Sequence, residues 1–279
     1  MSNPVHMNIA ILVCDTPLPP VVAKYGDYFA MFQGLLGQGF RDLDLSQEAL
    51  KDVKLTFKEH QMVNMDPLPE IGSVDAMLIT GSKHDAWADD PWILRLTEFI
   101  QSAVNLHNIP VVGVCFGHQI LARALGAKVG RSDAGWEISA GKIDLTETGK
   151  QIFGKDTLVS SLWETLITHD PDCPQSIHQM HRDIVIGAPP AGCVNLATSS
   201  LCDIQGLYSP GRLLSVQGHP EFNEGIMSFI LEARHDNGVF DDELYKDGLS
   251  RAGDHQDGRL IARTMAKFML DTKITSLRK

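Results

Sequence analysis

Short apolar runs alternate with helical patterns over the first half of the chain. Residues 7–14, 76–80 and 111–114 are brief apolar runs of the kind that buried strands show. Residues 25–36 carry aromatic and leucine side chains at helical spacing before Gly37, and residues 91–106 carry one apolar stripe after a proline. Strands that alternate with helices in this way predict an α/β fold with a doubly wound, mostly parallel sheet.

The alternation is lost between about residues 127 and 217. Short apolar segments separated by Gly, Pro and Asp replace it, at 143–145, 184–186, 194–197 and 213–216. We expect these segments to form an antiparallel extension of the sheet. Two helices are predicted after them, at 224–233 and about 259–270, and the polar stretch 236–257 between the helices is predicted to be a mobile loop or insert. No internal repeat or linker interrupts the pattern, so we predict a single domain over residues 1–279 with a helical extension from about 224.

The composition narrows the classes of function. Hydrophobic residues make up 43% and charged residues 21% of the 279 residues, as in ordinary globular proteins. The 24 Lys and Arg against 35 Asp and Glu give a net charge of −11, which repels phosphate backbones and anionic lipid. We therefore expect neither nucleic acid nor membrane as a partner. The N-terminal apolar run is far shorter than the ~20 residues of a spanning helix and has no basic leader, which favours a cytoplasmic protein.

The five cysteines are scattered and odd in number, which favours a reducing compartment over a disulfide framework. They are Cys14, Cys115, Cys173, Cys193 and Cys202. No pair has the spacing of zinc ligands, and no glycine-rich phosphate loop is present. We therefore predict neither a metal nor a cofactor.

Cys115 lies where a predicted strand turns at once into a predicted helix. Gly113 and Gly117 flank it at the spacing of a nucleophile elbow, a turn too tight for Cβ atoms at these two positions. The N-terminus of the following helix supplies free N–H groups and partial positive charge, which favour the reactive thiolate. Taken alone, a buried and inert cysteine is an equal alternative.

A second segment supplies a base. The strand at 213–216 delivers His219 to the carboxyl edge of the sheet, and Glu221 follows across Pro220, which favours extended backbone. A carboxylate bonded to one imidazole nitrogen fixes the tautomer while the other nitrogen takes the thiol proton. A lone His-Pro pair is more often a surface turn, but the two segments together predict a triad of Cys115, His219 and Glu221.

Both segments resemble those of the class I glutamine amidotransferases. The resemblance lies in Gly-Val-Cys-Phe-Gly-His-Gln at 113–119 and Gln-Gly-His-Pro-Glu at 217–221. It implies a flavodoxin-like fold and a hydrolase that cleaves a γ-glutamyl amide through a thioester on the cysteine. It further implies that Gln119 binds the substrate and that the backbone N–H of Phe116 is one oxyanion donor. The second donor is carried over to Gly81, in a loop with Thr-Gly-Ser where many members have Gly-Gly-Pro.

A narrower resemblance is to the plant γ-glutamyl peptidases and related free-standing fungal proteins. It lies in residues 80–87, 90–93, 115–119 and 179–183. It implies that the substrate is glutamine or a γ-glutamyl peptide such as a glutathione conjugate, and that Ser82, Gln179 and His181 line the pocket. His181 is also a second candidate base, ranked below His219 because no carboxylate follows it at the His-x-Glu spacing.

Two alternatives stay open. One is a glutaminase subunit that delivers ammonia to a separate synthetase, because the chain after Phe222 is too short to hold a synthetase domain. The other is a non-catalytic binding or sensor protein of the related DJ-1-like type, which keeps an elbow cysteine without a His-Pro-Glu segment.

Overall fold

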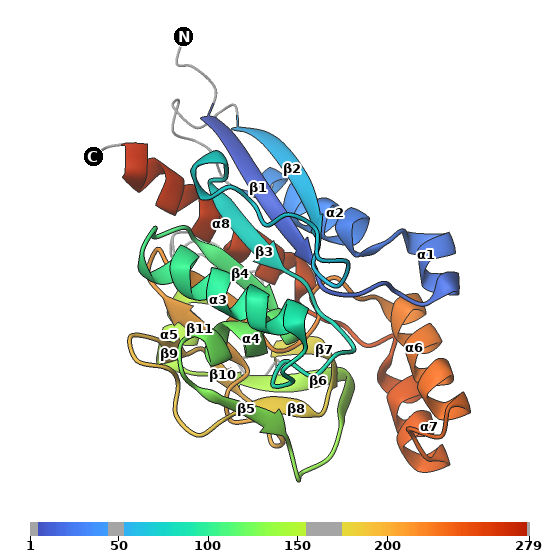
Figure 1. The fold of residues 1–279 in the computed structure, drawn as a ribbon. Helices are drawn as coiled ribbons and strands as arrows, with labels where there is room; N and C mark the ends of the chain where they lie inside the picture. The colour runs from blue at the N-terminus through green and yellow to red at the C-terminus, as the bar shows by residue number, and fades with distance from the viewer. Residues whose placement is uncertain (1–4, 44–52, 155–174, 278–279) are drawn as a thin grey trace, which may run out of the picture.

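A seven-stranded sheet forms the centre of the structure, a computed structural model that describes residues 5–43, 53–154 and 175–277 (Figure 1). The strand order is β2-β1-β3-β4-β12-β11-β9. Their bounds are β1 Val5–Val13, β2 Val53–Gln61, β3 Ala76–Ile79, β4 Val111–Val114, β9 Val194–Asn195, β11 Gly206–Ser209 and β12 Leu213–Val216. The pairs from β2 to β12 are parallel, and β11 and β9 continue the sheet antiparallel. This confirms the predicted mostly parallel sheet with an antiparallel extension. The expected members of the extension were partly wrong, because 213–216 pairs parallel with β4 and the segments 143–145 and 184–186 belong to separate sheets.

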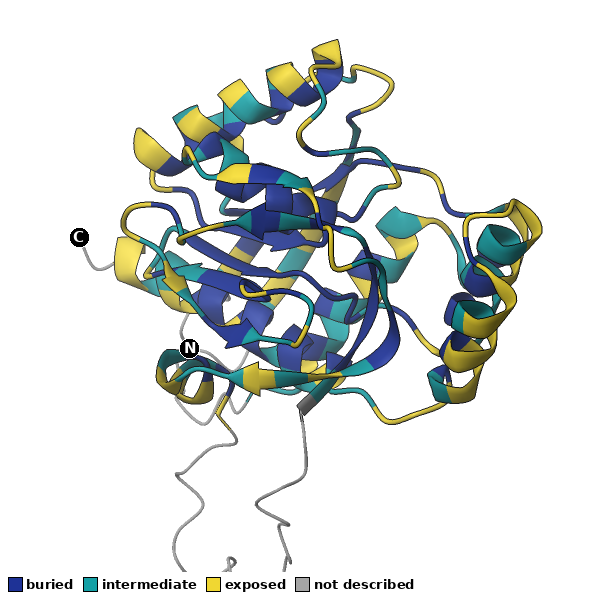
Figure 2. Cartoon of the chain, turned by 90° about the horizontal axis from the view of Figure 1, so that it is seen from below, coloured by how far each residue is buried: buried dark blue, intermediate teal, exposed yellow. Residues whose placement is uncertain are grey.

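Helices cover both faces of the sheet (Figure 1). Helices α3 (Pro91–Asn105) and α4 (Phe116–Ala124) lie on one face, and α2 (Tyr28–Arg41) and α8 (Gly258–Leu277) on the other. Successive side chains of a strand point to opposite faces. In β1, Leu12 therefore packs with the first helix pair and Ile11 with the second. Figure 2 shows the result, with buried strands at the centre and exposed outer helix faces. A strand covered on both faces forms a continuous apolar run, which is the pattern of residues 7–14.

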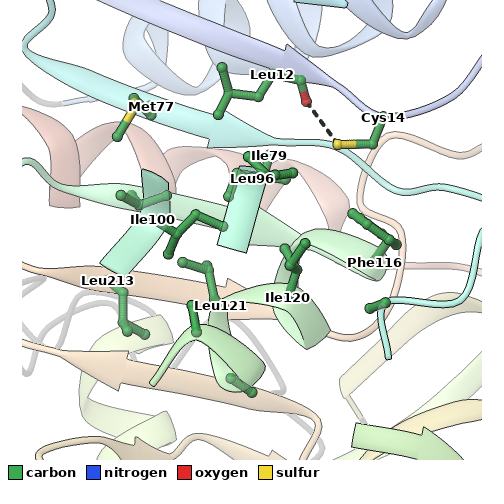
Figure 3. Close-up of a cluster of buried hydrophobic side chains, with 14 of the residues drawn as sticks. Leu12, Cys14, Met77, Ile79, Leu96, Ile100, Phe116, Ile120, Leu121 and Leu213 are labelled. Atoms are coloured by element: carbon green, nitrogen blue, oxygen red, sulfur yellow. Dashed lines mark hydrogen bonds between the residues drawn. The ribbon is translucent and has the colours of Figure 1, made fainter. Parts of the chain in front are cut away.

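The core beneath α3 and α4 reaches the start of α4 (Figure 3). Ile79 of β3, Ile100 of α3 and Ile120 of α4 belong to one buried cluster. Phe116, the first residue of α4, is 1% exposed in this cluster and its ring stacks on that of Trp92, with centroids 5.4 Å apart. The first turn of α4 is thus held by the core, and so is the residue that precedes it.

Two small antiparallel sheets complete the strands of the described residues. One joins β10 (Ala197–Thr198), β6 (Glu137–Leu145) and β7 (Gln175–His181), and the other joins β5 (Lys128–Arg131) to β8 (Asp183–Ile186). A bridge between His178 and His219 links β7 to the segment after β12. The small sheets therefore contact the chain where His219 leaves the main sheet.

The predicted end of the first helix was wrong. The structure has α1 (Pro19–Tyr25), a break at Gly26, and then α2, which continues through Gly37 to Arg41. Helix α2 packs closely on α8, and a Cβ at Gly39 would overlap the carbonyl oxygen of Ala262. Tertiary packing of this kind overrides the low helix propensity of glycine.

The predicted loop at 236–257 is also not a loop throughout. It contains α7 (Asp242–Arg251), whose N-terminal cap is Asp241, a side chain that accepts a hydrogen bond from the N–H of Leu244. Arg251 donates to two carbonyl oxygens of β6, those of Ile138 and Ala140. The cap and these long-range bonds hold a polar segment as a helix. The other elements are η2 Ile71–Ser73, α5 Glu147–Phe153 and α6 Glu224–Asp236.

One predicted strand was divided, and several short elements were not predicted. The stretch 194–197 splits between two sheets, because β9 joins the main sheet and β10 joins β6. Strands β5, β7 and β11 and helices α1 and α5 had no prediction, since short elements carry too few residues for a clear period.

Candidate active site

Cys115 occupies the turn between β4 and α4 with an unusual backbone conformation. Its φ of 52° and ψ of −103° are sparsely populated for a residue with a side chain, and such strain concentrates at functional sites. A Cβ at Gly113 would lie 2.5 Å from the carbonyl oxygen of Gly117, and a Cβ at Gly117 would overlap the carbonyl oxygen of Ile79. Both glycines are therefore required by close backbone approach, as the nucleophile elbow predicts.

Backbone pairing brings His219 next to this turn. The N–H of Cys115 donates to the carbonyl oxygen of Val216, the last residue of β12, at 3.0 Å. Three residues later the N–H of His219 donates to the carbonyl oxygen of His178 in β7, at 2.7 Å. The histidine is thus fixed between the main sheet and a small sheet.

The imidazole of His219 is bonded to Glu221. Its Nδ1 lies 2.8 Å from Oε1 of Glu221, whose side chain is 1% exposed. The ring stacks on Phe222, with centroids 4.1 Å apart and planes 5° apart. The carboxylate selects the tautomer with hydrogen on Nδ1, so Nε2 is left for a reacting group.

The charges around His219 favour its protonated form. Burial alone lowers the pKa of the imidazole, but the charges of Cys115 and Glu221, with hydrogen bonds to both, raise the pKa of His219 to about 10. An imidazolium next to a thiol stabilises the thiolate, the nucleophilic form of cysteine.

The loop after β3 lies against the same two side chains. A Cβ at Gly81 would be 2.8 Å from Cε1 of His219 and 3.7 Å from Cβ of Cys115. The Oγ1 atom of Thr80 donates to the Gly81 carbonyl oxygen and accepts from the N–H of Cys14. Phe116 offers a further N–H, because the first residues of a helix have no intrahelical acceptor. Gly81 and Phe116 therefore both lie next to Cys115, and their role as oxyanion donors stays a prediction.

The predicted substrate-binding residues divide into two groups. Ser82 belongs to the first group and lines a cavity of about 500 Å³ beside His219.

The two glutamines form the second group, and both are buried. The Nε2 atom of Gln119 donates to the Asp183 carbonyl oxygen at 2.7 Å and to Oε1 of Gln217 at 3.1 Å. Gln179, fully buried, donates to Gln205 at 3.0 Å. The structure does not place the two glutamine side chains on the cavity, and their role in binding stays a prediction.

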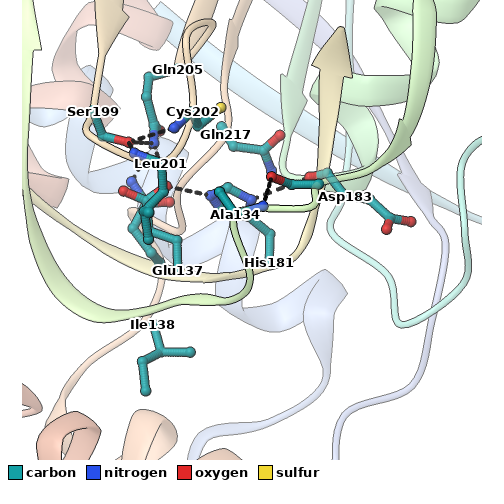
Figure 4. A network of polar contacts seen from close by, with 12 residues as sticks. Ala134, Glu137, Ile138, His181, Asp183, Ser199, Leu201, Cys202, Gln205 and Gln217 are labelled. Carbon is teal, nitrogen blue, oxygen red and sulfur yellow. Dashed lines mark hydrogen bonds and ion pairs between the residues drawn. The ribbon is translucent and has the colours of Figure 1, made fainter. Parts of the chain in front are cut away.

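His181 belongs to a separate polar network (Figure 4). Its Nε2 lies 3.1 Å from Oε2 of Glu137, and its Nδ1 lies 3.2 Å from the Asp183 carbonyl oxygen. Both ring nitrogens lie next to protein oxygen atoms of this network, but Nε2 completes no hydrogen bond among the described residues. The role of His181 as an alternative base stays a prediction. Met180 lies between Gln179 and His181 in β7 and lines the cavity beside His219, because alternate residues of a strand face opposite sides. The partner Glu137 is far away in sequence, which is why no local spacing indicated it.

Several cavity residues were not predicted. Six carry polar groups: Asp15 and Thr16 after β1, Tyr28 of α2, Lys83 after β3, Arg234 of α6 and Asn237 directly after α6. The position of Asp15 at the carboxyl edge of a parallel strand was a usable signal, since ligands bind at that edge. No comparable sequence signal indicated Arg234, which lies in a helix of the C-terminal part of the chain.

The other described cysteines lie in surroundings that keep the thiol protonated. Burial raises the pKa of the Cys14 thiol far above its ordinary range and that of Cys202 to about 12, and it also raises the pKa of Cys193. These thiols stay protonated and unreactive at neutral pH. Cys173 lies outside the described residues.

The described residues contain neither a metal-binding cluster nor a membrane-spanning helix. Residues 5–43, 53–154 and 175–277 contain no group of three or more His, Cys, Asp or Glu side chains that could hold a metal ion. The same residues contain no helix that is long and apolar enough to cross a membrane.

Comparison with known proteins points to one family. Residues 53–234 match the family model for glutamine amidotransferase class-I. A glutamine amidotransferase-like protein of Schizosaccharomyces pombe is 31% identical, over 95% of this chain and 99% of that protein. Gamma-glutamyl peptidase 3 of Arabidopsis thaliana is 26% identical, over 93% of this chain and 94% of the peptidase.

Solved structures agree on the fold. A glutamine amidotransferase from Methylobacillus flagellatus superposes with a TM-score of 0.64 at 20% identity, over 99% of this chain and 95% of that one. A glutamine amidotransferase from Thermotoga maritima superposes with a TM-score of 0.61 at 17% identity, over 98% of this chain and 99% of that one.

Proposed function

Because the chain belongs to the class I glutamine amidotransferase family, we propose that it is a cysteine hydrolase that cleaves a γ-glutamyl amide bond with Cys115, His219 and Glu221. The observation that carries the proposal is the bond of 2.8 Å between His219 and Glu221, beside a cysteine on a strained elbow. A non-catalytic DJ-1-like sensor has no need of a base oriented by a buried carboxylate.

The first half of the reaction forms a thioester. The Cys115 thiolate attacks the γ-carbonyl carbon, and the backbone N–H groups of Gly81 and Phe116 stabilise the oxyanion. His219 Nε2–H then protonates the leaving nitrogen as the carbon–nitrogen bond breaks. Ammonia leaves if the substrate is glutamine, and an amine leaves if it is a peptide.

The second half consumes water. Neutral His219 takes a proton from water, whose oxygen attacks the thioester carbonyl. The carbon–sulfur bond breaks, glutamate is released, and the thiolate and imidazolium are restored. Glu221 holds the Nδ1–H bond throughout and stabilises the imidazolium.

We propose a γ-glutamyl peptide as the substrate rather than free glutamine. The likeness to an Arabidopsis γ-glutamyl peptidase over 93% of this chain supports this choice. So does the cavity of about 500 Å³ beside His219, which has room for more than an ammonia leaving group. The remaining alternative is a glutaminase subunit that works with a synthetase.

The test offers purified protein glutamine and glutathione separately and measures glutamate release. Peptide turnover above glutamine turnover, lost in Cys115→Ala and retained in Cys193→Ala, supports the proposal. Faster glutamine turnover with ammonia release makes the protein a glutaminase. If neither substrate is hydrolysed until a second protein is added, the protein is an amidotransferase subunit.

A further inference from the structure

Arg234 is a half-buried cation in the cavity beside His219. It lies on α6 and lines the cavity together with residues of the segment after β1 and with His219 itself. In Figure 1, α6 lies beside α1, the helix that follows β1, at one side of the sheet. Among the described residues, no side-chain or backbone oxygen forms an ion pair or hydrogen bond with its guanidinium.

Aromatic rings hold the guanidinium in place without neutralising it. Its Cζ atom lies 4.6 Å from the centroid of the Trp136 ring and 5.8 Å from that of Phe240. The two rings pack edge to face, with centroids 5.3 Å apart. The N–H of Val239 donates to the Arg234 carbonyl oxygen at 2.8 Å, which turns Phe240 back onto the arginine. The contacts position the cation and leave its N–H groups for a ligand.

The carboxylate in the same cavity is already bonded elsewhere. Oδ1 of Asp15 lies 2.9 Å from Nζ of Lys83 and accepts from the N–H of Thr16, and its Oδ2 accepts from the N–H of Lys83. Among the described residues the guanidinium of Arg234 is therefore left without an ion pair or hydrogen bond. Burial lowers its pKa, although the charges of Cys115, Tyr28 and Asp15 act in the opposite direction. Burying a charge without a partner is costly, and a carboxylate matches the planar fork of arginine with two hydrogen bonds.

The rest of the lining indicates which carboxylate fits. The wall is mainly apolar, with side chains from α1, α2 and α6: Val21, Met31, Ile226 and Ile230. A γ-glutamyl head group is a zwitterion and does not suit an apolar wall. His219 also lines this cavity, and in the mechanism it protonates the leaving nitrogen. The leaving group therefore extends into the cavity.

We propose that Arg234 is a specificity-determining residue that binds the C-terminal carboxylate of the leaving group, with the apolar wall around an apolar substituent such as that of an S-alkylated glutathione. This inference rests on the proposed function, because it assigns the cavity to the leaving side of a γ-glutamyl bond.

The test compares S-hexylglutathione with its C-terminal amide in the wild type, Arg234→Met and Lys246→Met. The wild type should favour the acid over the amide by about 10- to 100-fold in kcat/KM, as a charge-assisted hydrogen bond allows. In Arg234→Met the ratio should fall to about one. Lys246→Met removes an exposed cation of α7 and should keep the wild-type ratio. Equal losses on acid, amide and glutamine would instead assign Arg234 to the γ-glutamyl head group and overturn the proposal.

A binding measurement separates this inference from the proposed function. Calorimetry on Cys115→Ala, with and without Arg234→Met, measures affinity for S-hexylglutathione without turnover. If binding to Cys115→Ala depends on Arg234 but the wild type hydrolyses none of the substrates, the subsite is kept and the proposed function is rejected. Turnover of the acid with an acid-to-amide ratio unchanged in Arg234→Met rejects the subsite alone, and neither binding nor turnover rejects both.

Discussion

At the residue scale, the protonation of His219 links the electrostatics of the site to its chemistry. Its pKa is raised from 6.5 to about 10 by Cys115 and Glu221 in spite of burial. A raised pKa means that the interactions stabilise the folded protein fully below pH 6.5 and that this contribution is lost as pH rises through about 10. The imidazolium is thus present over the whole neutral range.

Nuclear magnetic resonance of the His219 ring nitrogens tests this. We expect the wild-type ring to stay protonated at neutral pH and to titrate near pH 10. Cys115→Ala removes the largest favourable charge while burial remains, so the ring should titrate at a lower pH. Cys202→Ala serves as the control and should leave the titration unchanged. Identical curves for wild type and Cys115→Ala would show that the two side chains do not interact.

A second residue-scale prediction concerns the elbow. Gly117→Ala places a methyl group on the carbonyl oxygen of Ile79, which forces the start of α4 away from β3. Overpacking of this kind costs roughly 1–3 kcal/mol of unfolding free energy, and the displaced Cys115 should lose most activity. Gly34→Ala in α2 is the matched control, since a Cβ there meets nothing within 4 Å. Urea unfolding should show a stabilised or unchanged control, and equal stability of both variants would contradict the steric account.

At the element scale, the loops after β1 and β3 act as one unit. Asp15, after β1, accepts from the N–H of Lys83 at 2.8 Å, two residues beyond Gly81. The bond holds the loop that carries the proposed oxyanion donor, so we predict that Asp15 is a positioning residue.

Asp15→Asn should loosen this loop and lower kcat on a γ-glutamyl substrate by about tenfold with less change in KM, because oxyanion donors act in the transition state. Asp89→Asn is the control, since it also removes a carboxylate from an ion pair, with Arg123, but at a side chain 79% exposed. Steady-state measurements of kcat and KM for both variants test this prediction. A rise in KM at constant kcat would place Asp15 in substrate binding instead.

At the scale of the whole molecule, the site depends on the junction between the main sheet and a small sheet. The N–H of His219 donates to the carbonyl oxygen of His178, so β7 helps to place the base. Gly218 permits this approach, because a Cβ there would lie 2.8 Å from Cγ2 of Ile177 and 2.9 Å from the His178 carbonyl oxygen.

Gly218→Ala should therefore separate the two sheets locally and reduce activity at least tenfold, while the protein stays folded. Gly141→Ala in β6 is the control, since its nearest atom would be 3.6 Å away, an ordinary contact. Activity and thermal unfolding measured on both variants check the claim. Full activity of Gly218→Ala would mean that the junction does not position His219.

The sequence alone determined the features that depend on local sterics and periodicity. The glycines at 113 and 117 indicated the elbow because only a tight strand–helix turn excludes Cβ atoms there. The Glu two residues after His219 indicated its orienting partner. Continuous apolar runs indicated parallel strands covered on both faces. That all of this forms one domain stays a prediction.

Only the tertiary structure decided what depends on residues distant in the chain. It paired His181 with Glu137, turned Gln119 toward Gln217, and brought Arg234 from a C-terminal helix into the cavity beside His219. It also formed α7 from a polar stretch, through the bonds of Arg251 to β6. Spacing along the chain carries no record of such contacts, because they arise when separate elements pack and their remaining hydrogen-bonding groups must find partners.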